Sequence, residues 1–425
     1  MRLLYVLFST IYERQYDIGA IDLDAGHTVS GGHLAYIQYL YENLRLPDVD
    51  PTTVYQFHHP PLHHAISALW MHIVGIFVKS SDVIEESMQF VPFVCSIVIL
   101  IIASKLLTQL GIKGRAHDLV MVIVAFHPAL ILLSGSVNND CMALMFTLLC
   151  IYRALEWYRE RTMKNICLTA LWLGLGMSTK QNVAELALPL GLMFLIVLIQ
   201  TIRQKDNIRQ PIIQYMTFLA ISVPTGMWFY VRNLVKYDMS MLWVYELSED
   251  SWQYTGNVPV INRFLWPVPA EMLENIKSFK IGCGYNVWMQ LMRTSVLGEW
   301  DMGSVGRIIK LVAVLLMLAG AILAISAFIG YVRGFVFGTK FKEYRVFYTA
   351  AYLTTMVCYL IFAYNYPQEC SMNFRYIEVA LFLQSPGLAV LFDEVKSKAF
   401  KVSFYTVLGG FAILSVIMCG VWCLQ

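Results

Sequence analysis

The stretch "MQFVPFVCSIVILIIAS", residues 88 to 104, decides the fold class. It contains no charged side chain, and about 20 consecutive apolar residues suffice to cross a bilayer as a helix. The connection that follows, residues 105 to 118, carries Lys105, Lys113 and Arg115. A long apolar run with a basic connection at its end is typical of a membrane span that ends in the cytoplasm. The stretch therefore predicts a transmembrane helix.

Apolar runs of similar length recur along the 425-residue chain, of which 58% is hydrophobic and 14% charged. We predict further spans at approximately 119–137, 141–158, 165–178, 184–202, 212–231, 306–332, 346–364, 376–392 and 402–424. The opening "MRLLYVLFSTIY" is too short to cross a bilayer and is interpreted as the outer end of a first span that is short or truncated. The prediction is one all-α polytopic membrane domain, residues 1–425, with about 11 transmembrane helices.

The distribution of basic residues sets the sidedness of these spans. Five connections carry 17 of the 31 lysine and arginine residues, and all five fall on one side if the spans alternate: 105–118, 153–164, 203–210, 333–345 and 394–401. The positive-inside rule makes that side cytoplasmic. The net charge of +2, without a basic run, gives no reason to expect a nucleic-acid partner.

Two large segments are then external, residues 12–87 and 233–305. Within the first, "HLAYIQYLYENL" (33–44) predicts an amphipathic helix lying on the membrane. "LHHAISALWMHIVGIFVK" (62–79) begins and ends on the outer side. We therefore expect a helix at the interface, or one that dips in and out, rather than a crossing.

An acidic residue follows the first span directly. Asp17 stands where the chain emerges from the membrane, so its carboxylate could accept or orient the proton of an acceptor hydroxyl at the surface. Asp22 and Asp24 follow it and are interpreted as part of a solvated acidic loop.

A histidine-rich motif, "FHHPPLHH" (57–64), lies near the end of the first external segment. Its prolines predict an extended entry and the start of a helix. Three interpretations of its histidines stay open: a metal site, hydrogen bonding to a phosphate or sugar, or a purely structural role. We favour hydrogen bonding to substrate, with His58, His59 and His63 as the candidates.

Ionisable residues also stand at the outer ends of later spans. Asp140, in "SGSVNNDCMA", is a candidate catalytic residue, although capping of the next helix explains it equally well. Three cations are candidates for binding a lipid phosphate: Lys180, Arg232 and Arg375. The alternative for these cations is snorkelling at helix ends. Tyr376 is interpreted as part of the aromatic belt at the interface.

The nine cysteines form no CxxC pair, which gives no indication of a zinc ribbon or a redox motif. Cys283 and Cys370 are both expected outside, where an oxidising compartment would permit a disulfide.

The order of six motifs resembles a known family. "YDIG", "HHPPLHH", "SGSVNNDCMA", "STKQN", "YVRNLVKYD" and "MNFRYI" occur in sequence along nearly the whole chain. In this order they resemble bacterial members of the glycosyltransferase family 39-like group. That group is related to the dolichyl-phosphate-mannose protein mannosyltransferases and the lipid A aminoarabinose transferases, within the GT-C superfamily.

The resemblance implies a GT-C fold, with juxtamembrane helices and the catalytic acid in the first outer segment, and a polyprenyl-phosphate sugar donor. Asp17 matches the acid after the first span, Asp140 matches the acid of the second outer loop, and Lys180 and Arg375 fall where cations can meet the donor phosphate. One difference is Ile18, which follows Asp17 where the family commonly has a second acid. Asp22 and Asp24 therefore stay alternatives for the base.

These observations together predict a glycosyltransferase of the cell membrane that works on its external face. Its partners would be a polyprenyl-phosphate sugar donor, membrane lipids, and a lipid, protein or polysaccharide acceptor. No cofactor is required on this interpretation, because the phosphate is itself a competent leaving group, and a divalent metal stays an alternative. A transporter or flippase of lipid-linked precursors is the second hypothesis, and a histidine-based metalloenzyme is the third.

Overall fold

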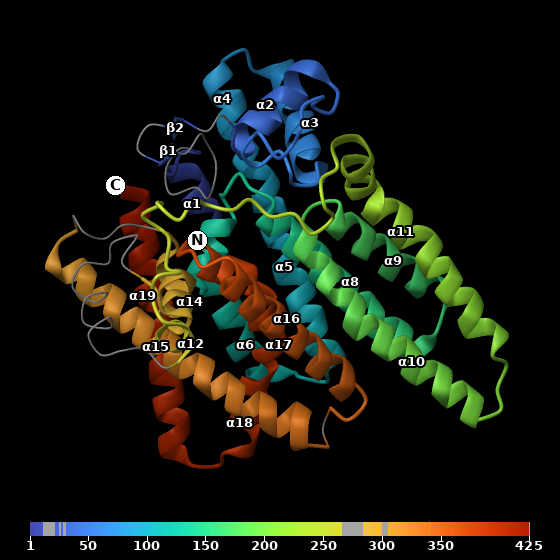
Figure 1. Ribbon diagram of the computed structural model, residues 1–425. Helices are drawn as coiled ribbons and strands as arrows, with labels where there is room; N and C mark the ends of the chain where they lie inside the picture. Colours follow the sequence, from blue (N-terminus) through green and yellow to red (C-terminus); the bar gives the residue numbers. More distant parts are fainter. Residues whose placement is uncertain are drawn as a thin grey trace.

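The computed structural model describes residues 1–11, 22–24, 27–28, 31–265, 284–299, 305–339 and 341–424. Helices dominate them and form one bundle, with a smaller group of helices at one end (Figure 1). A two-stranded antiparallel sheet, β1 (Asp22–Asp24) and β2 (His27–Thr28), lies in that same end group. The predicted all-α polytopic class is confirmed.

Seven helical segments in the described part of the chain are long and apolar enough to cross a membrane. They comprise α4 (Ser81–Glu86), η1 (Ser87–Gln89) and α5 (Phe90–Gln109) together; α8 (Asp140–Glu160); η2 (Gln181–Leu186) with α10 (Ala187–Arg203); α11 (Arg209–Tyr237); α15 (Arg307–Tyr331) with the π-helix η3 (Val332–Phe337); α16 (Arg345–Asn365); and α19 (Lys398–Leu424).

The other predicted spans are shorter or broken, which the apolar runs do not show. The run 119–137 is divided into α6 (Gly114–Phe126) and α7 (Pro128–Leu133), and the run 376–392 into α17 (Glu378–Gln384) and α18 (Pro386–Glu394). Each second helix begins with a proline, which fits the first helical position. A proline disfavours helical angles in the residue before it, and His127 before Pro128 is extended, whereas Ser385 before Pro386 keeps helical angles. The run 165–178 is α9 (Met163–Met177).

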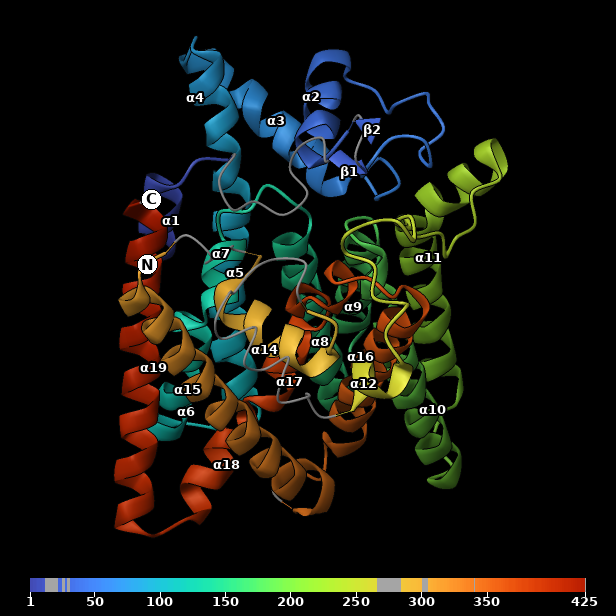
Figure 2. The same ribbon diagram turned by 60° about the vertical axis from the view of Figure 1, so that its left-hand side comes forward.

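The first external segment contains the helices that the sequence predicts. α2 (His33–Asn43), α3 (Leu62–Phe77) and α4 lie together above one end of the bundle (Figure 2). The amide of Leu62 donates to the carbonyl of Ser178 (3.0 Å), which ties the start of α3 to the end of α9. The basic connections α5–α6, α10–α11, η3–α16 and α18–α19 lie at the opposite end.

The N-terminal helix α1 (Arg2–Phe8) anchors the start of the chain. It packs beside the end of α19, where the rings of Tyr5 and Trp422 meet edge to face. Arg2 donates to the carbonyls of Ala125 (2.8 Å) and Val124 (3.1 Å), at the break between α6 and α7. A short α1 therefore supplies donors to carbonyls that a helix end leaves without partners.

The second external segment carries α12 (Val260–Phe264) and α14 (Val287–Leu297), and the connection after α16 carries η4 (Cys370–Met372) and η5 (Phe374–Tyr376). The amide of Phe374 donates to Thr294 Oγ1 (2.9 Å). This contact fixes η5 against α14 and so positions the residues that follow it.

Two glycines allow the backbones of α15 and α18 to pack closely against each other. A Cβ on Gly330 would lie 1.9 Å from the carbonyl oxygen of Gly387, and a Cβ on Gly387 would lie 2.2 Å from the carbonyl oxygen of Ala327. Both distances are far inside van der Waals contact. Small residues at helix crossings in membranes permit this close backbone packing.

Replacing Gly387 with Ala should therefore lower the free energy of unfolding by about 1–3 kcal/mol, because the two helices must move apart. Unfolding in detergent micelles, followed by circular dichroism, measures the change. Gly409→Ala in α19 is the matched control, since a Cβ there meets nothing within 4 Å. Equal stability of the two variants would contradict the close packing.

Candidate functional site

The candidate site is built around Asp140, the first residue of α8 and only 1% exposed. The amide of Asp140 donates to Asn138 Oδ1 (3.1 Å), and Asn139 Nδ2 donates to the carbonyl of Thr179 (3.0 Å). The turn before α8 is thereby joined to the turn after α9. A carboxylate at a helix N-terminus is also favoured by the helix dipole.

Lys180 reaches Asp140 from the neighbouring turn. Its amide donates to the carbonyl of Gly176 (2.9 Å), and its ammonium forms an ion pair with Asp140 Oδ1. The lysine is 7% exposed. The cation is therefore held in the bundle rather than extended into water.

Arg375 approaches the other oxygen of the same carboxylate. Its Nη1 lies 3.8 Å from Asp140 Oδ2. The ring of Tyr376 lies beside both cations, with its centroid 4.9 Å from Lys180 Nζ and 5.2 Å from Arg375 Cζ. Tyr376 therefore lies at the site and not only in an interfacial belt, and its ring face stabilises the cations. We call Asp140, Lys180, Arg375 and Tyr376 the cation cluster.

Glu378, in the first turn of α17, is a further acidic residue beside the cation cluster. It is 7% exposed and interacts electrostatically with Asp140, Lys180 and Arg375. Glu378 is not among the site residues predicted from the sequence. The signal was present, because an ionisable residue within an apolar run is functional by default in a membrane protein.

Histidines from two elements meet next to the cluster. His33 Nδ1 lies 2.8 Å from His64 Nε2, and the ring of His33 stacks on that of His59 at a centroid distance of 5.5 Å. His63 is fully buried, within electrostatic range of Asp140, and neither ring nitrogen has a hydrogen-bond partner among the described residues. Its position suits hydrogen bonding to a ligand. His58 instead contacts the rings of His59 and Trp243.

Burial decides the charge of His33 and His59. Desolvation, followed by nearby cations and histidines, lowers the pKa of both side chains well below the ordinary value of 6.5. Both rings are therefore neutral at neutral pH. Neutral imidazoles both donate and accept hydrogen bonds, which suits polar contacts with a sugar or phosphate. The described residues present no three histidine, cysteine or carboxylate side chains arranged to hold a metal ion.

These pKa shifts predict that the protein becomes less stable in acid. Below about pH 6.5 the unfolded chain binds protons at these histidines while the folded chain does not, so stability falls by up to about 1.4 kcal/mol per pH unit per histidine. Unfolding measured between about pH 7 and pH 5 tests this. The slope should be smaller in His33→Gln than in the unchanged protein, and an identical slope would contradict the assignment to His33.

Arg232, a predicted phosphate ligand, has other partners. Its Nη2 donates to the carbonyl of Pro47 (2.8 Å) and its Nη1 to Asn233 Oδ1 (2.7 Å). Lys236 and Tyr237 bind Asp48 nearby. In the described residues Arg232 therefore joins the end of α11 to the first external segment and makes no contact with Asp140.

Asp17 and Cys283 fall outside the described residues, so the proposed base and the proposed disulfide with Cys370 are not placed. Asp22 and Asp24 form the two ends of strand β1.

The fold and the cation cluster define a class: a polytopic, all-α membrane protein with buried ionisable side chains gathered at one end of its bundle. Residues 65–256 match the family model described as dolichyl-phosphate-mannose-protein mannosyltransferase, so the resemblance expected from the sequence is confirmed. No curated protein sequence matches the chain significantly.

Two solved structures are similar to this chain, and the first, with a TM-score of 0.50, supports the fold. ArnT from Cupriavidus metallidurans in the apo state is 11% identical, with a TM-score of 0.50, over 94% of this chain and 59% of that chain. The oligosaccharyltransferase AglB from Archaeoglobus fulgidus, in complex with an inhibitory peptide and a dolichol-phosphate, is 12% identical over 98% of this chain and 55% of that chain, with a TM-score of 0.49. The chain thus spans about 59% of the length of ArnT.

Proposed function

We propose that this protein transfers a sugar from a polyprenyl-phosphate donor to an acceptor at the external face of the cell membrane. The observation that carries the proposal is the cation cluster, in which two buried cations, Lys180 and Arg375, share the carboxylate of Asp140. These three residues come from separate connections of the chain. Two buried cations side by side can both donate charge-assisted hydrogen bonds to one anionic ligand, which supports a phosphate as that ligand.

The relatives support our choice of a lipid phosphate as the ligand of these cations. The matching family is named for a dolichyl-phosphate-mannose donor. ArnT from C. metallidurans also has a structure with bound undecaprenyl phosphate, which is 12% identical to this chain with a TM-score of 0.41. A lipid phosphate at Lys180 and Arg375 would receive charge-assisted hydrogen bonds from both.

The chemistry follows from the donor. The bond between the sugar C1 and the phosphate oxygen breaks, and the phosphate leaves with the electron pair as polyprenyl phosphate. A bond forms between C1 and the acceptor oxygen, whose proton passes to a base, for which we propose Asp17. We propose that Lys180 and Arg375 stabilise the charge that develops on the phosphate and that His59 and His63 hydrogen-bond the donor. We expect transfer to continue in the presence of a metal chelator.

The proposed external location of the site rests on the distribution of basic residues between the two ends of the bundle. The cation cluster involves the turns before α8 and after α9, which lie toward α2–α4 and away from the basic connections. The positive-inside rule places those connections in the cytoplasm.

Proteoliposomes with radiolabelled polyprenyl-phosphate sugars test the proposal. The expected result is cleavage of the sugar from the lipid, with loss of transfer in Asp17→Asn and full transfer in Asp82→Asn, an exposed acid of the same external segment. Movement of an intact labelled lipid between leaflets, without cleavage, would instead indicate a flippase. Full transfer by Asp17→Asn would remove Asp17 from the mechanism.

A further inference from the structure

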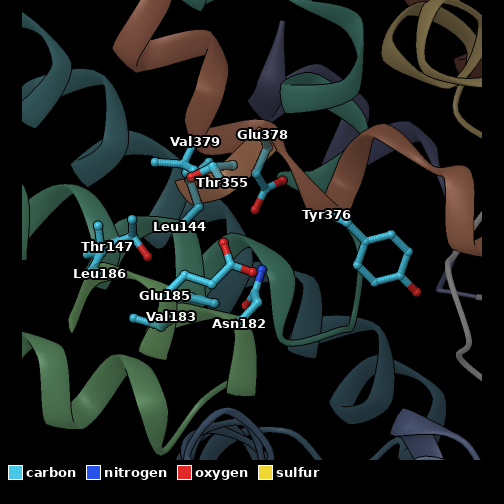
Figure 3. Close-up of a pocket in the computed structure, with 11 residues that line it drawn as sticks. Leu144, Thr147, Asn182, Val183, Glu185, Leu186, Thr355, Tyr376, Glu378 and Val379 are labelled. Carbon is cyan, nitrogen blue, oxygen red and sulfur yellow. The ribbon is translucent and has the colours of Figure 1, made fainter. Parts of the chain in front are cut away.

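Two cavities of the described structure differ in size and lining. The first lies beside the cation cluster, with Asn182, Glu185 and Glu378 in its lining (Figure 3). Its volume is about 30 Å³, which leaves room for little more than a water molecule. The second is a groove of about 340 Å³ in another part of the bundle. Of the two, the groove has room for part of an organic ligand, about ten groups of the size of a water molecule or a methylene.

The groove lies between α10 and α16, beside η3. Its apolar lining consists of Leu192 of α10, Val336 of η3, and Val346, Ala350 and Leu353 of α16. Leu192, Val346 and Leu353 are exposed, and both α10 and α16 belong to segments that can cross a membrane. An exposed apolar groove between two such helices faces the hydrocarbon of the bilayer. A lipid chain is therefore the occupant that its surroundings supply.

The depth of the groove matches one leaflet. Arg345 and Leu353 line it at its two ends along α16, a separation of about 12 Å at a rise of ~1.5 Å per residue. Half of the hydrocarbon core of a bilayer is about 15 Å thick. The groove starts at the η3–α16 connection, at the end of the bundle that carries the basic connections. The positive-inside rule makes this the cytoplasmic leaflet.

Arg345 brings a positive charge to the outermost part of the groove. It is half-buried as the first residue of α16, whose N-terminus has no side-chain cap and so also favours an anion. Its Nη2 donates to the carbonyl of Gly338, and its Nε is buried without a partner among the described residues. Arg333, at the same end, pairs with Glu394 at 3.0 Å, whereas the described structure gives Arg345 no carboxylate within 4 Å.

We propose that the groove binds one anionic phospholipid of the cytoplasmic leaflet, with an acyl chain between α10 and α16 and the headgroup phosphate at Arg345. Basic pockets between membrane helices on the cytoplasmic side are suited to anionic headgroups. A zwitterionic phospholipid brings its own ammonium, which competes with Arg345 for the phosphate, so the anionic lipid is preferred. This site is separate from the cation cluster at the other end of the bundle and does not depend on the proposed function.

The lipid would lie between the two helices that lead to the cation cluster. Lys180 directly precedes η2 and α10, and Arg375 follows α16 through η4. A chain that fills the groove adds packing between α10 and α16. Bound anionic phospholipid should therefore raise the temperature at which the protein unfolds, as well as stay with the protein during purification.

Native mass spectrometry of the full-length protein, released from detergent micelles, tests the site. Phosphatidylglycerol and phosphatidylcholine with the same acyl chains are added in equal amounts. The expected result is one retained phosphatidylglycerol, preferred at least about fivefold, as one cation near an anionic headgroup gives. Arg345→Met should lose the preference and Arg345→Lys should keep it.

Two further variants separate the groove from general surface charge. Lys398→Met removes an exposed cation at the same end of the bundle and should keep the preference. Ala350→Phe places a ring in the groove and should lower retention of the lipid while leaving Arg345 in place. Equal retention of the two lipids, an unchanged preference in Arg345→Met, or full retention by Ala350→Phe would overturn the proposal. A preference lost equally in Lys398→Met, or lost instead in Lys180→Met/Arg375→Met, would overturn it as well.

Discussion

Replacing Lys180 with Met is expected to lower the rate of sugar transfer by about a hundredfold to a thousandfold, the usual effect of removing one preorganised group that stabilises transition-state charge. The lysine supplies one of two cations at the proposed phosphate site. Its loss also leaves Arg375 as the nearest cation to Asp140, 3.8 Å away, so that less of the arginine's charge acts on the phosphate. Initial rates with saturating acceptor measure the effect.

Lys79→Met is the matched control for this variant. Lys79 belongs to the same external segment as α3 and is exposed, with its ammonium near the carbonyl of Gly75. The Lys79→Met variant should transfer sugar at the normal rate. If Lys180→Met also transferred at the normal rate, the cation cluster would have no part in the reaction.

The second large effect concerns stability. Arg293 of α14 and Glu369 form an ion pair at 3.0 Å, with side chains 3% and 6% exposed. Removing one partner of a buried pair leaves an uncompensated charge, so Arg293→Met should lower the free energy of unfolding by about 3–5 kcal/mol. Because Glu369 precedes η5, the same variant should weaken the positioning of Arg375. Denaturant unfolding in micelles measures the stability.

Two comparisons separate this effect from a general loss of charge. The double variant Arg293→Met/Glu369→Leu should recover much of the lost stability, because no charge is left buried alone. The exposed pair of Arg333 and Glu394, also at 3.0 Å, should contribute at most about 1 kcal/mol, so Arg333→Met should be nearly neutral. Equal losses in Arg293→Met and Arg333→Met would contradict the argument from burial.

Much of this architecture could be predicted from the sequence because the bilayer restricts the possibilities. Apolar runs identify spans, and basic connections identify their direction, as for the stretch 88–104 and its connection 105–118. Alternation then places the turns with Asp140, Lys180 and Arg375 at one end, where the structure brings the three together. The sequence shows Pro128 and Pro386 but does not show that helices end beside them, because prolines are also tolerated inside membrane helices.

The finer features of the site depend on contacts between residues far apart in the sequence. The stacking of His33 on His59 and the hydrogen bond between Arg232 and Pro47 follow from the docking of the first external segment, which no periodicity encodes. Glu378 lies near the start of the predicted apolar run 376–392, next to the more conspicuous Arg375. Its significance appears only when Asp140 and the two cations lie beside it.

Binding of radiolabelled polyprenyl phosphate to the purified protein in nanodiscs tests the central claim most directly. Unlabelled polyprenyl phosphate should displace the label, and the uncharged polyprenol of the same length should not. The double variant Lys180→Met/Arg375→Met should lose binding, whereas Lys79→Met should retain it. Retention of full affinity by the double variant, or equal displacement by the uncharged lipid, would contradict a phosphate site at these two cations.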